Sequence, residues 1–319
     1  MRKLVLVLLF LTSPALAQDW PAKPVRVVVG YPAGGGHDFT ARVVSARLAE
    51  MLKQPFVVEN RTGASGTIAT DGIAKGPADG YSFIVASPAE TVVGAVSGLK
   101  MNYDWEKDLA PVSVIGETPL AIAVHPKVGV SNIKELLEHA KRNPGKLSYG
   151  TPGSGSSMHF AGESLKTYAG VFIVHIPYRG AAPAVSDLLG GQVDVGIVGM
   201  PPVVGPHKAG KIRIVAVTSE KRSAATPDIP AMAELPGFAG YNFTNWTGVF
   251  VATKTPPAIV ERLSSEIGKV VKEPAIRDKL LGAGVDPLGL TPSQAAQFFA
   301  REKAVYSKIA KARNIRADE

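Results

Sequence analysis

The strongest constraint on the fold is a repeated order of apolar strand, glycine-rich loop and helix. Residues 25–31 form a β-branched apolar run, residues 32–36 (PAGGG) follow it, and beyond Asp38 apolar residues recur at helical spacing. The same order occurs twice more, with strand and loop at 56–59 and 63–66 and again at 147–150 and 151–157. Strands that alternate with helices predict an α/β fold built on a parallel, right-handed, doubly wound sheet.

The length of the chain and one long extended stretch together predict two such domains. With 319 residues the chain exceeds the usual size of one hydrophobic core. Residues 112–125 read as extended chain with an interruption at 116–119, a suitable place for a crossing between domains. We expect the C-terminal helices to pack back on the first sheet, so that two crossings join the domains. The expected domains are 18–118 plus 246–319, and 119–245.

Further elements complete this organisation. We expect additional strands at 81–86, 171–176, 193–198, 212–217 and 247–252. We expect helices at 68–74, 159–168 and 182–189, and one capped by Ser131 with apolar residues from Ile133 to Ala140. Two C-terminal helices carry Ile259, Leu263, Ile267 and Val270, and then Phe298, Val305 and Ile309, on one face each. Trp246 and Phe250 are expected in the core more readily than against a ligand.

The first residues have the pattern of a secretory signal peptide. Arg2 and Lys3 precede an apolar run at 4–11, and a small-residue site (ALA) follows at 15–17. The run is about half the ~20 residues that a membrane span needs. We therefore expect cleavage after Ala17 and export to the periplasm.

Composition excludes several classes of protein. The chain has no cysteine, which removes thiolate metal sites, thiol nucleophiles, iron–sulfur clusters and disulfides. The 35 Lys and Arg residues outnumber the 27 Asp and Glu residues, for a formal charge of +8, and two basic residues leave with the signal peptide. The others are interleaved with acids, as at 269–279, so no basic stripe points to a nucleic-acid partner.

The three loops predict a cleft that binds an anion. Open α/β sheets bind ligands at the carboxyl ends of their strands, and all three glycine-rich loops lie there. Each loop opens a helix, whose free N–H groups and positive dipole end favour a carboxylate. The plainer alternative is that the glycines only allow tight strand-to-helix turns.

Other site chemistries have weaker support. A Ser/His hydrolase would pair His159 with a nearby serine such as Ser154 or Ser157, but no Gly-x-Ser-x-Gly elbow accompanies them. His37 beside Asp38 suggests a metal site, although the other histidines are scattered, and Asp38 also fits a helix N-cap. The loops lack a full dinucleotide fingerprint and a Gly-Lys-Ser/Thr sequence. We therefore expect no catalysis, no metal and no cofactor.

Six segments of the mature chain form a recognisable series. They are residues 31–38 (YPAGGGHD), 58–64 (VENRTGA), 79–81 (DGY), 178–194 (with YRG, Pro183-Ala184 and GGQVD), 216–222 (AVTSEKR) and 246–256 (with WTGVF and Thr255-Pro256). This series resembles the Bug family of extracytoplasmic solute receptors, the TctC-like substrate-binding proteins of tripartite tricarboxylate transporters. The resemblance implies a type II periplasmic-binding-protein fold that closes on a small carboxylate and delivers it to a two-subunit membrane permease. We expect such a receptor to be a monomer.

The resemblance also implies which residues bind the ligand. In the family, the first loop, the loop after the second strand and the glycine- and serine-rich loop of the second domain hold the ligand carboxylate. The matching positions of the first domain are Tyr31, Ala33, Gly34, Gly35, Asp38, Ser65, Gly66 and Thr67. Those of the second domain are Thr151, Ser154, Ser157 and His159. Further candidates are Ser87, just beyond the third strand, and Tyr178, Arg179 and Asp194.

Some positions depart from the family pattern. His37 stands where a small or hydroxyl residue is usual, and it offers an additional hydrogen bond to the ligand. Ser65 and Thr67 replace a common glycine and asparagine, and Gly199-Met200 replaces a frequent Phe-Asp pair. Loss of that acid argues against a cationic amino group on the ligand. A sensor that reports the ligand to a membrane signalling partner is an alternative that fits the same residues.

Overall fold

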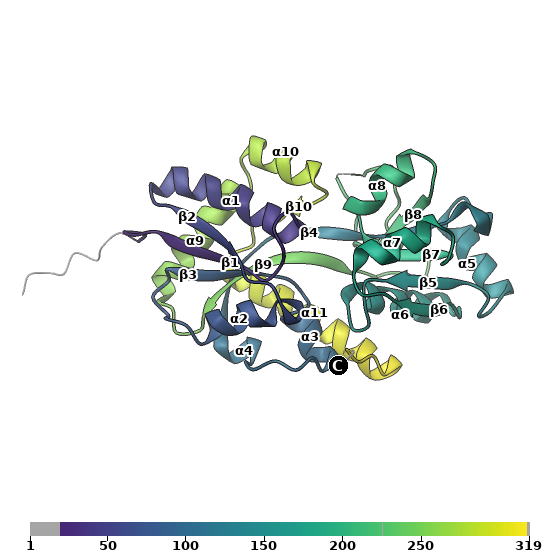
Figure 1. The fold of residues 1–319 in the computed structure, drawn as a ribbon, viewed down its shortest axis with the longest axis horizontal. Helices are drawn as coiled ribbons and strands as arrows, with labels where there is room; N and C mark the ends of the chain where they lie inside the picture. Colours follow the sequence, from purple (N-terminus) through teal and green to yellow (C-terminus); the bar gives the residue numbers. More distant parts are fainter. Residues whose placement is uncertain (1–19, 225, 318–319) are drawn as a thin grey trace, which may run out of the picture.

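Two α/β domains lie side by side in the computed structural model, which describes residues 20–224 and 226–317 (Figure 1). We call the half with the N-terminal strands domain 1 and the other half domain 2. The expected signal peptide lies outside the described residues. Within the described ranges, no helix has both the length and the apolar character that crossing a membrane requires.

Three parallel strands begin the sheet of domain 1. β1 (Val25–Val29) lies between β2 (Phe56–Asn60) and β3 (Ser82–Ala86) and runs parallel to both. The helices that follow them are α1 (Gly36–Leu52), the short η1 (Ala64–Gly66) with α2 (Thr67–Ala74), and α3 (Val92–Ser97) with α4 (Trp105–Asp108). β1 is buried almost throughout, as suits a β-branched strand that is covered on both faces.

Two antiparallel strands cross between the domains. β4 (Leu109–Val124) is a single strand of 16 residues, and β9 (Thr244–Ala252) pairs with it from Pro119 opposite Thr244 to Leu109 opposite Ala252. β9 also pairs antiparallel with β3, and the short β10 (Asp286–Pro287) pairs antiparallel with β4. The predicted parallel pairing therefore does not hold for these strands, because the chain returns to domain 1 along the strand by which it left. The expected interruption at 116–119 is wrong too, since these residues pair with β9 in unbroken register and the register shifts of β4 lie earlier, at 111–113 and 114–116.

Domain 2 repeats the arrangement on the far half of β4. β5 (Ser148–Thr151) lies parallel to β6 (Val174–Pro177) and β7 (Val195–Gly199), and β4 joins β7 and β8 (Arg213–Val217) antiparallel. The helical elements are η2 (Pro126–Val128), α5 (Ile133–Arg142), α6 (Ser157–Ala169), α7 (Ala181–Leu189), α8 (Pro201–Lys208) and η3 (Met232–Glu234). The prediction that Ser131 caps α5 is wrong, because the Asn132 side chain accepts the N–H of Glu135 at 3.0 Å. α8 was not expected, since three prolines and a glycine interrupt its sequence, but two of the prolines occupy its first turn.

The two faces of the sheets differ in how the core is divided. On one face a single core runs through both domains, from α2, α3 and α11 (Pro292–Arg313) to α5 and α6. On the other face α1, α9 (Pro257–Val270) and α10 (Pro274–Gly282) cover a core of domain 1, while α7 and α8 cover a separate core of domain 2. The domains are thus joined along one face and independent along the other.

The C-terminal helix α11 makes much of the joint. It packs on β4 and α3 of domain 1 and on α6 of domain 2, where the Tyr306 and Phe160 rings meet edge to face at 5.0 Å. The expectation that the C-terminal helices cover the first sheet is confirmed, as α9 and α11 both contact β4. Val305 is 38% exposed, so its predicted place on the buried face is wrong. Trp246 and Phe250 are buried in the core as expected.

Candidate ligand-binding site

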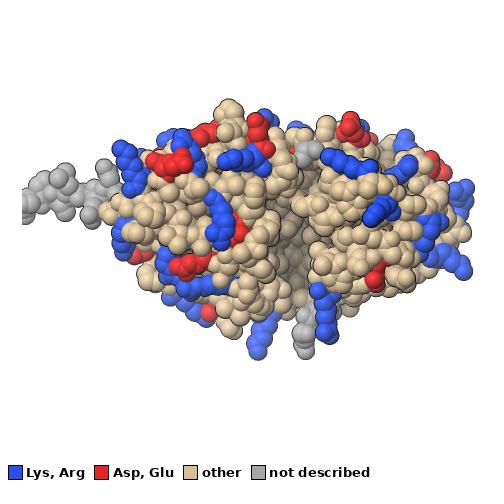
Figure 2. Space-filling view, turned by 45° about the horizontal axis from the view of Figure 1, so that its top comes forward, with Lys and Arg blue, Asp and Glu red and all other residues tan. Residues whose placement is uncertain are grey.

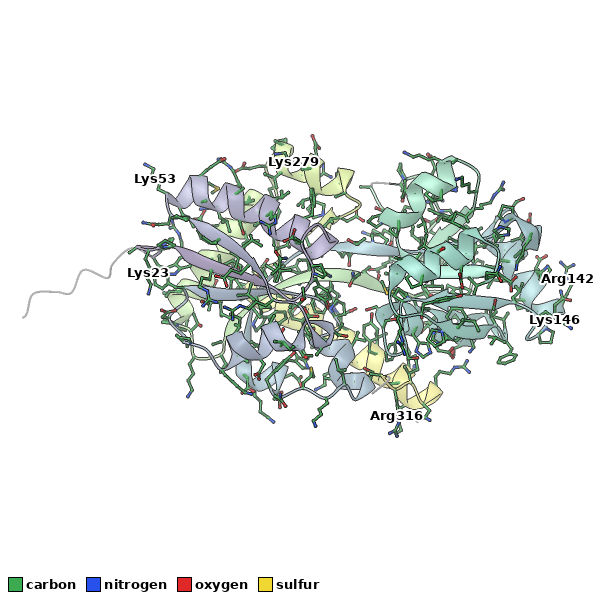
Figure 3. The ribbon with its side chains drawn as sticks, viewed as in Figure 1. Lys23, Lys53, Arg142, Lys146, Lys279 and Arg316 are labelled. Carbon is green, nitrogen blue, oxygen red and sulfur yellow. The ribbon has the colours of Figure 1, made fainter. Side chains whose placement is uncertain are left out.

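A groove separates the two domains, and its visible walls carry few charged side chains (Figure 2). Lys and Arg are scattered over both halves with Asp and Glu among them. Lys23, Lys53 and Lys279 project outward from domain 1, and Arg142 and Lys146 project from the far end of domain 2 (Figure 3). The positive net charge is therefore spread over the surface and not gathered at the groove.

The carboxyl ends of both sheets face this groove. The first residues of β9, 244 and 245, lie toward domain 2. Ala86, the last residue of β3, pairs with Gly248, so β3 ends toward domain 2. On β4, the last residue of β7 is opposite Leu120, at the end of the domain 2 half that lies nearest domain 1. The strands of each domain therefore end toward the other domain. This direction brings the three predicted loops to the groove from opposite sides.

The first loop leads from β1 into α1 and is shaped by Asp38. Gly34 adopts a φ of +84°, and its N–H donates to Asp38 Oδ2 at 2.8 Å. Arg42 and Asn60 also donate to this carboxylate, and although burial favours its neutral form, these hydrogen bonds hold the pKa of Asp38 below its ordinary value. The N-cap of α1 is Gly35, so the prediction that Asp38 is the cap is wrong: the helix starts earlier and Asp38 lies in its first turn. Asp38 fixes the loop, while residues 32–36 are exposed.

His37 connects the first loop to the crossing strand β9. Its side chain is 9% exposed, with Nδ1 at 3.0 Å from Thr247 Oγ1 and Nε2 at 3.4 Å from Asn245 Nδ2. Because an amide nitrogen only donates, Nε2 accepts and Nδ1 carries the proton that is donated to Thr247. Burial lowers the pKa of His37 to about 4, so the ring is neutral near pH 7. Both ring nitrogens therefore bond to β9.

The second loop, after β2, has three successive residues in left-handed conformations. Ala64, Ser65 and Gly66 have φ values of +44°, +52° and +89°. The buried Thr67 closes the turn, since its hydroxyl donates to the Ala64 carbonyl at 2.8 Å. Ser65 is exposed at the tip of this turn. The first two loops lie against each other, because a Cβ at Gly30 would be 2.7 Å from Gly66 Cα.

A buried acid that was not predicted lies beneath these two loops. Glu90 is fully buried, and its carboxylate accepts from the Tyr31 hydroxyl at 2.6 Å, from the Ser87 N–H at 2.8 Å and from the Ser87 hydroxyl. A Cβ at Gly66 would be 2.9 Å from Glu90 Cδ. The predicted residues Tyr31, Ser87 and Gly66 therefore meet at one carboxyl group. The signal in the sequence was an acid three residues after Ser87, the serine just beyond the third strand.

The loop of domain 2 is closed by its own residues. Ser156 is the N-cap of α6: its Oγ accepts the His159 N–H at 3.2 Å and donates to the Gly153 carbonyl at 2.7 Å. The Gly155 N–H donates to Nδ1 of His159 at 3.1 Å. Ser154 is half-buried on this loop, and Ser157 is buried in the first turn of α6. His159 thus accepts a backbone hydrogen bond with the nitrogen that faces the loop.

Histidine stacking supports the base of this loop. The rings of His159 and His175 stack at 3.9 Å, and His175 Nε2 is 2.7 Å from Oγ1 of the fully buried Thr151. Nε2 of His159 is 4.0 Å from Glu163 Oε1. These contacts make His159 and Thr151 supports of the loop.

The last three candidates lie in different places. The segment with Tyr178 and Arg179 runs beside the domain 2 loop, with the Gly180 N–H bonded to the Pro152 carbonyl at 2.9 Å. Tyr178 donates to Asp187 at 2.7 Å, and Arg179 is exposed.

Asp194 does not join the site. Its carboxylate accepts from the N–H and hydroxyl of Ser148 at 2.8 and 3.0 Å and pairs with Lys127 at 3.0 Å. Ser148 begins β5, so Asp194 lies at the amino ends of the strands, opposite the loop. The prediction that Asp194 contacts the ligand is therefore wrong. Asp194 belongs to the family motif, but it precedes β7 and so lies at the amino edge of the sheet.

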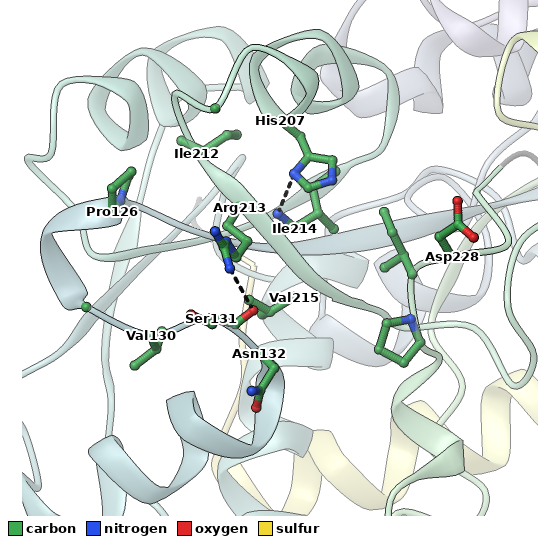
Figure 4. Close-up of a pocket in the computed structure, with 14 residues that line it drawn as sticks. Pro126, Val130, Ser131, Asn132, His207, Ile212, Arg213, Ile214, Val215 and Asp228 are labelled. Atoms are coloured by element: carbon green, nitrogen blue, oxygen red, sulfur yellow. Dashed lines mark hydrogen bonds between the residues drawn. The ribbon is translucent and has the colours of Figure 1, made fainter.

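A hollow of about 720 Å³ lies beside the first loop, between α1 and α10, and includes Gly34 and Asp38. Two further hollows lie away from the loops. One of about 390 Å³ lies between α8 of domain 2 and the end of α10 of domain 1 and includes Met200, the position where the family usually has an acid. A second, of about 700 Å³, lies at the edge of β8 (Figure 4). There Arg213 donates to the Ser131 carbonyl at 3.3 Å and His207 accepts the Ile214 N–H at 3.3 Å, so these side chains cover the strand edge. Among the described residues, no group of three His, Asp or Glu side chains suits a metal ion.

Two α/β domains, two crossing strands and a groove that receives loops from both sides define a two-domain substrate-binding protein. The comparisons agree with this class. The model of the tripartite tricarboxylate transporter family receptor matches residues 40–315, and the chain belongs to that family. The family and its solved members are substrate-binding receptors and not enzymes.

Named relatives cover nearly the whole chain. Protein BugT of Bordetella pertussis is 36% identical over 293 residues, which are 92% of this chain and 90% of BugT. An R. palustris protein solved with adipate has a TM-score of 0.81 and 35% identity, and covers 93% of this chain and 99% of its own. MatC of Rhodopseudomonas palustris, with bound malate, has a TM-score of 0.73 and 26% identity, and covers 91% and 99%. The predicted family and the predicted two-domain α/β fold are confirmed.

Proposed function

We propose that this protein is a periplasmic solute-binding protein that captures a small organic carboxylate between its domains and delivers it to a two-subunit membrane permease. One observation carries the proposal: loops that open helices reach the same groove from the carboxyl ends of both sheets. The adipate and malate in two related structures support a carboxylate as the ligand. The expected signal peptide with cleavage after Ala17, the monomeric state and the domain limits (18–118 plus 246–319, and 119–245) belong to the same proposal.

The proposed contacts come from loops on both walls. On domain 1 they are Tyr31, Ala33, Gly34, Gly35, Ser65, Gly66, Thr67 and Ser87, with His37 and Asp38 holding the first loop. On domain 2 they are Thr151, Ser154, Ser157, His159, Tyr178 and Arg179. Neutral N–H and O–H donors predominate, and Arg179 supplies the exposed positive charge beside the domain 2 loop.

Binding would then shift the balance between open and closed arrangements. A ligand that bridges both walls favours the closed state by its higher affinity for that state. The separate cores on one face of the sheets allow the domains to approach there, while the shared core and the crossing strands act as the joint.

Thermal unfolding with a panel of mono-, di- and tricarboxylates, including adipate and malate, tests the proposal. A ligand present at about one hundred times its dissociation constant adds about 2.7 kcal/mol of apparent stability. We expect at least one carboxylate to raise the unfolding temperature, and the increase to be reduced in Arg179→Gln. Arg213→Gln, at the hollow outside the groove, is the matched control and should respond like wild type. Stabilisation by neutral sugars or amines alone would contradict a carboxylate site.

A further inference from the structure

Glu90 occupies an unusual place for an acid in a site for anions. It follows β3 and lies under the first two loops, with its side chain fully buried. None of the ion pairs of the described residues includes Glu90. A buried carboxylate without a cation is costly, and it reduces that cost by binding a proton.

The hydrogen bonds around Glu90 can be counted in each protonation state. The Tyr31 hydroxyl lies 2.6 Å from Glu90 Oε2 and 2.7 Å from Ser87 Oγ, and Ser87 Oγ also contacts Glu90 Oε2. When Glu90 is ionised, it only accepts, so both hydroxyl hydrogens point to it. When Glu90 is protonated, it donates to one hydroxyl oxygen, and one hydroxyl hydrogen is released. The Tyr31 hydroxyl also lies 3.2 Å from the Ser65 carbonyl, so the hydrogen that Glu90 releases can point to the second loop, where the ligand is proposed to bind.

Burial, and not a neighbouring charge, opposes a negative charge at Glu90. Tyr31 faces Glu90 from the first loop, and the Tyr103 hydroxyl donates to the Glu90 carbonyl at 2.6 Å. The negative charge of Asp71, on α2, raises the pKa of the Tyr103 hydroxyl, and Asp71 is itself paired with Lys75. The neutral His37 ring lies 5.2 Å from the Tyr31 ring. Burial raises the pKa of Glu90 to about 7, against the opposing hydrogen bonds from Ser87 and Tyr31. The proton is therefore exchanged within the neutral range.

We infer that Glu90 is a positioning residue that couples carboxylate binding to the uptake of one proton, which frees a hydroxyl donor at Tyr31 and removes a like charge beneath the ligand. The inference rests on the proposed function. On this inference the ligand binds as a carboxylate and Glu90 carries a proton in the complex. Affinity therefore falls as the pH rises through the neutral range.

Calorimetric titration with adipate at pH 6, 7 and 8 tests the coupling, with malate and the other carboxylates of the panel titrated in parallel. We expect wild-type affinity to fall about tenfold from pH 6 to pH 8 as the proton must be supplied on binding. Titration at pH 8 in buffers of different ionisation enthalpy should show close to one proton taken up per ligand, and almost none at pH 6. Glu90→Gln, whose amide always donates, should bind at pH 8 as wild type does at pH 6.

Glu302→Gln is the matched control, because Glu302 is also a buried acid but is bonded to Trp246 of the core. It should keep the pH dependence of wild type. Carboxylate binding with no proton uptake at pH 8 would overturn the inference and leave the proposed function intact. The proton-uptake measurement uses wild type, so it decides the question even if Glu90→Gln does not fold.

An infrared difference spectrum of the ligand-free protein between pH 6 and pH 9 separates the remaining outcomes. The spectrum is recorded in the Glu302→Gln background, because burial raises the pKa of Glu302 to about 8 and its band would overlap. A protonated carboxyl band at pH 6 that disappears when Glu90→Gln is added supports the inference, and no such band in Glu302→Gln overturns it. If that band is present and no carboxylate of the panel binds at either pH, the proposed function fails, and the inference fails with it.

Discussion

The two walls of the groove hold their loops by different means. On domain 1, His37 bonds to Thr247 of β9, and the Glu90 carboxylate accepts hydrogen bonds from Tyr31 and Ser87. Distant parts of the chain therefore fix these loops. On domain 2, Ser156 and His159 bond to the backbone of their own loop. Domain 1 therefore depends on contacts between distant parts of the chain, whereas domain 2 combines a local helix cap with the stacked rings of His159 and His175. Substitutions and pH should act unequally on the two walls.

The largest difference in stability between the two walls is expected for substitutions of glycines within the loops. Gly66→Ala requires a left-handed alanine and puts its Cβ 2.9 Å from the buried Glu90 Cδ, so it should lower the free energy of unfolding by about 3–4 kcal/mol. Gly155→Ala, the counterpart on domain 2, puts its Cβ 2.8 Å from Ala317 Cα beyond the last helix. Ala317 lies outside any helix or strand, and its N–H bond to the Ser97 carbonyl holds it less firmly than core packing holds Glu90, so the segment can shift and we expect a cost of about 2 kcal/mol.

Urea unfolding of both variants measures this difference. Gly34→Ala is the control: it has a positive φ but no atom within 4 Å of the added Cβ, so it should lose only about 1–2 kcal/mol. Equal losses for Gly66→Ala and Gly155→Ala would mean that the two walls are equally rigid.

An intermediate effect is expected from His37 when the pH is lowered. The pKa of His37 is about 4 in the folded protein against an ordinary value of 6.5, so the unfolded chain binds more protons between these values. The free energy of unfolding should therefore fall by about 3 kcal/mol as the pH drops from 6.5 to 4, with the full stability present above pH 6.5.

Urea unfolding across this pH range, in wild type and His37→Gln, tests the effect. In His37→Gln the free energy of unfolding should not show this loss at low pH. His207→Gln, in domain 2 outside the groove, should show the same loss as wild type. The same pH dependence in wild type and His37→Gln would show that His37 is not the group that links domain 1 to pH.

The smallest effect is expected from the cap of domain 2. Ser156→Ala removes the acceptor for the His159 N–H and should cost about 1 kcal/mol in urea unfolding. Ser154→Ala, on the same loop but not the cap, should leave stability nearly unchanged and reduce ligand affinity instead. Loss of stability in Ser154→Ala as large as in Ser156→Ala would contradict the local closure of this loop.

The same contrast explains how much could be predicted from the sequence. The domain 2 loop, the strands and the positions of the glycines follow from local patterns, and the loops were predicted at the strand ends where they are found. The partner of His37 is 210 residues away, so no local pattern could reveal it. Glu90 was missed because its neighbours come from three strand ends that only the sheet brings together.

The errors also have physical causes. Asp38 was predicted as an N-cap because caps are read from residue type, but the glycines allowed α1 to begin three residues earlier, with Gly35 as its N-cap. Asp194 was included through the family motif, although strand direction places it at the opposite edge. The antiparallel crossing strands were missed because strand and helix alternation shows the order of elements and not the direction of each pairing.

A co-crystal structure with the carboxylate that stabilises the protein most tests whether the ligand bridges the two domains. We expect the carboxylate to contact the loop at 31–36 on one wall and the loop at 151–157 on the other, with the domains closed around it. A carboxylate bound to one domain only, or beside Arg213 in the hollow at the edge of β8, would contradict it.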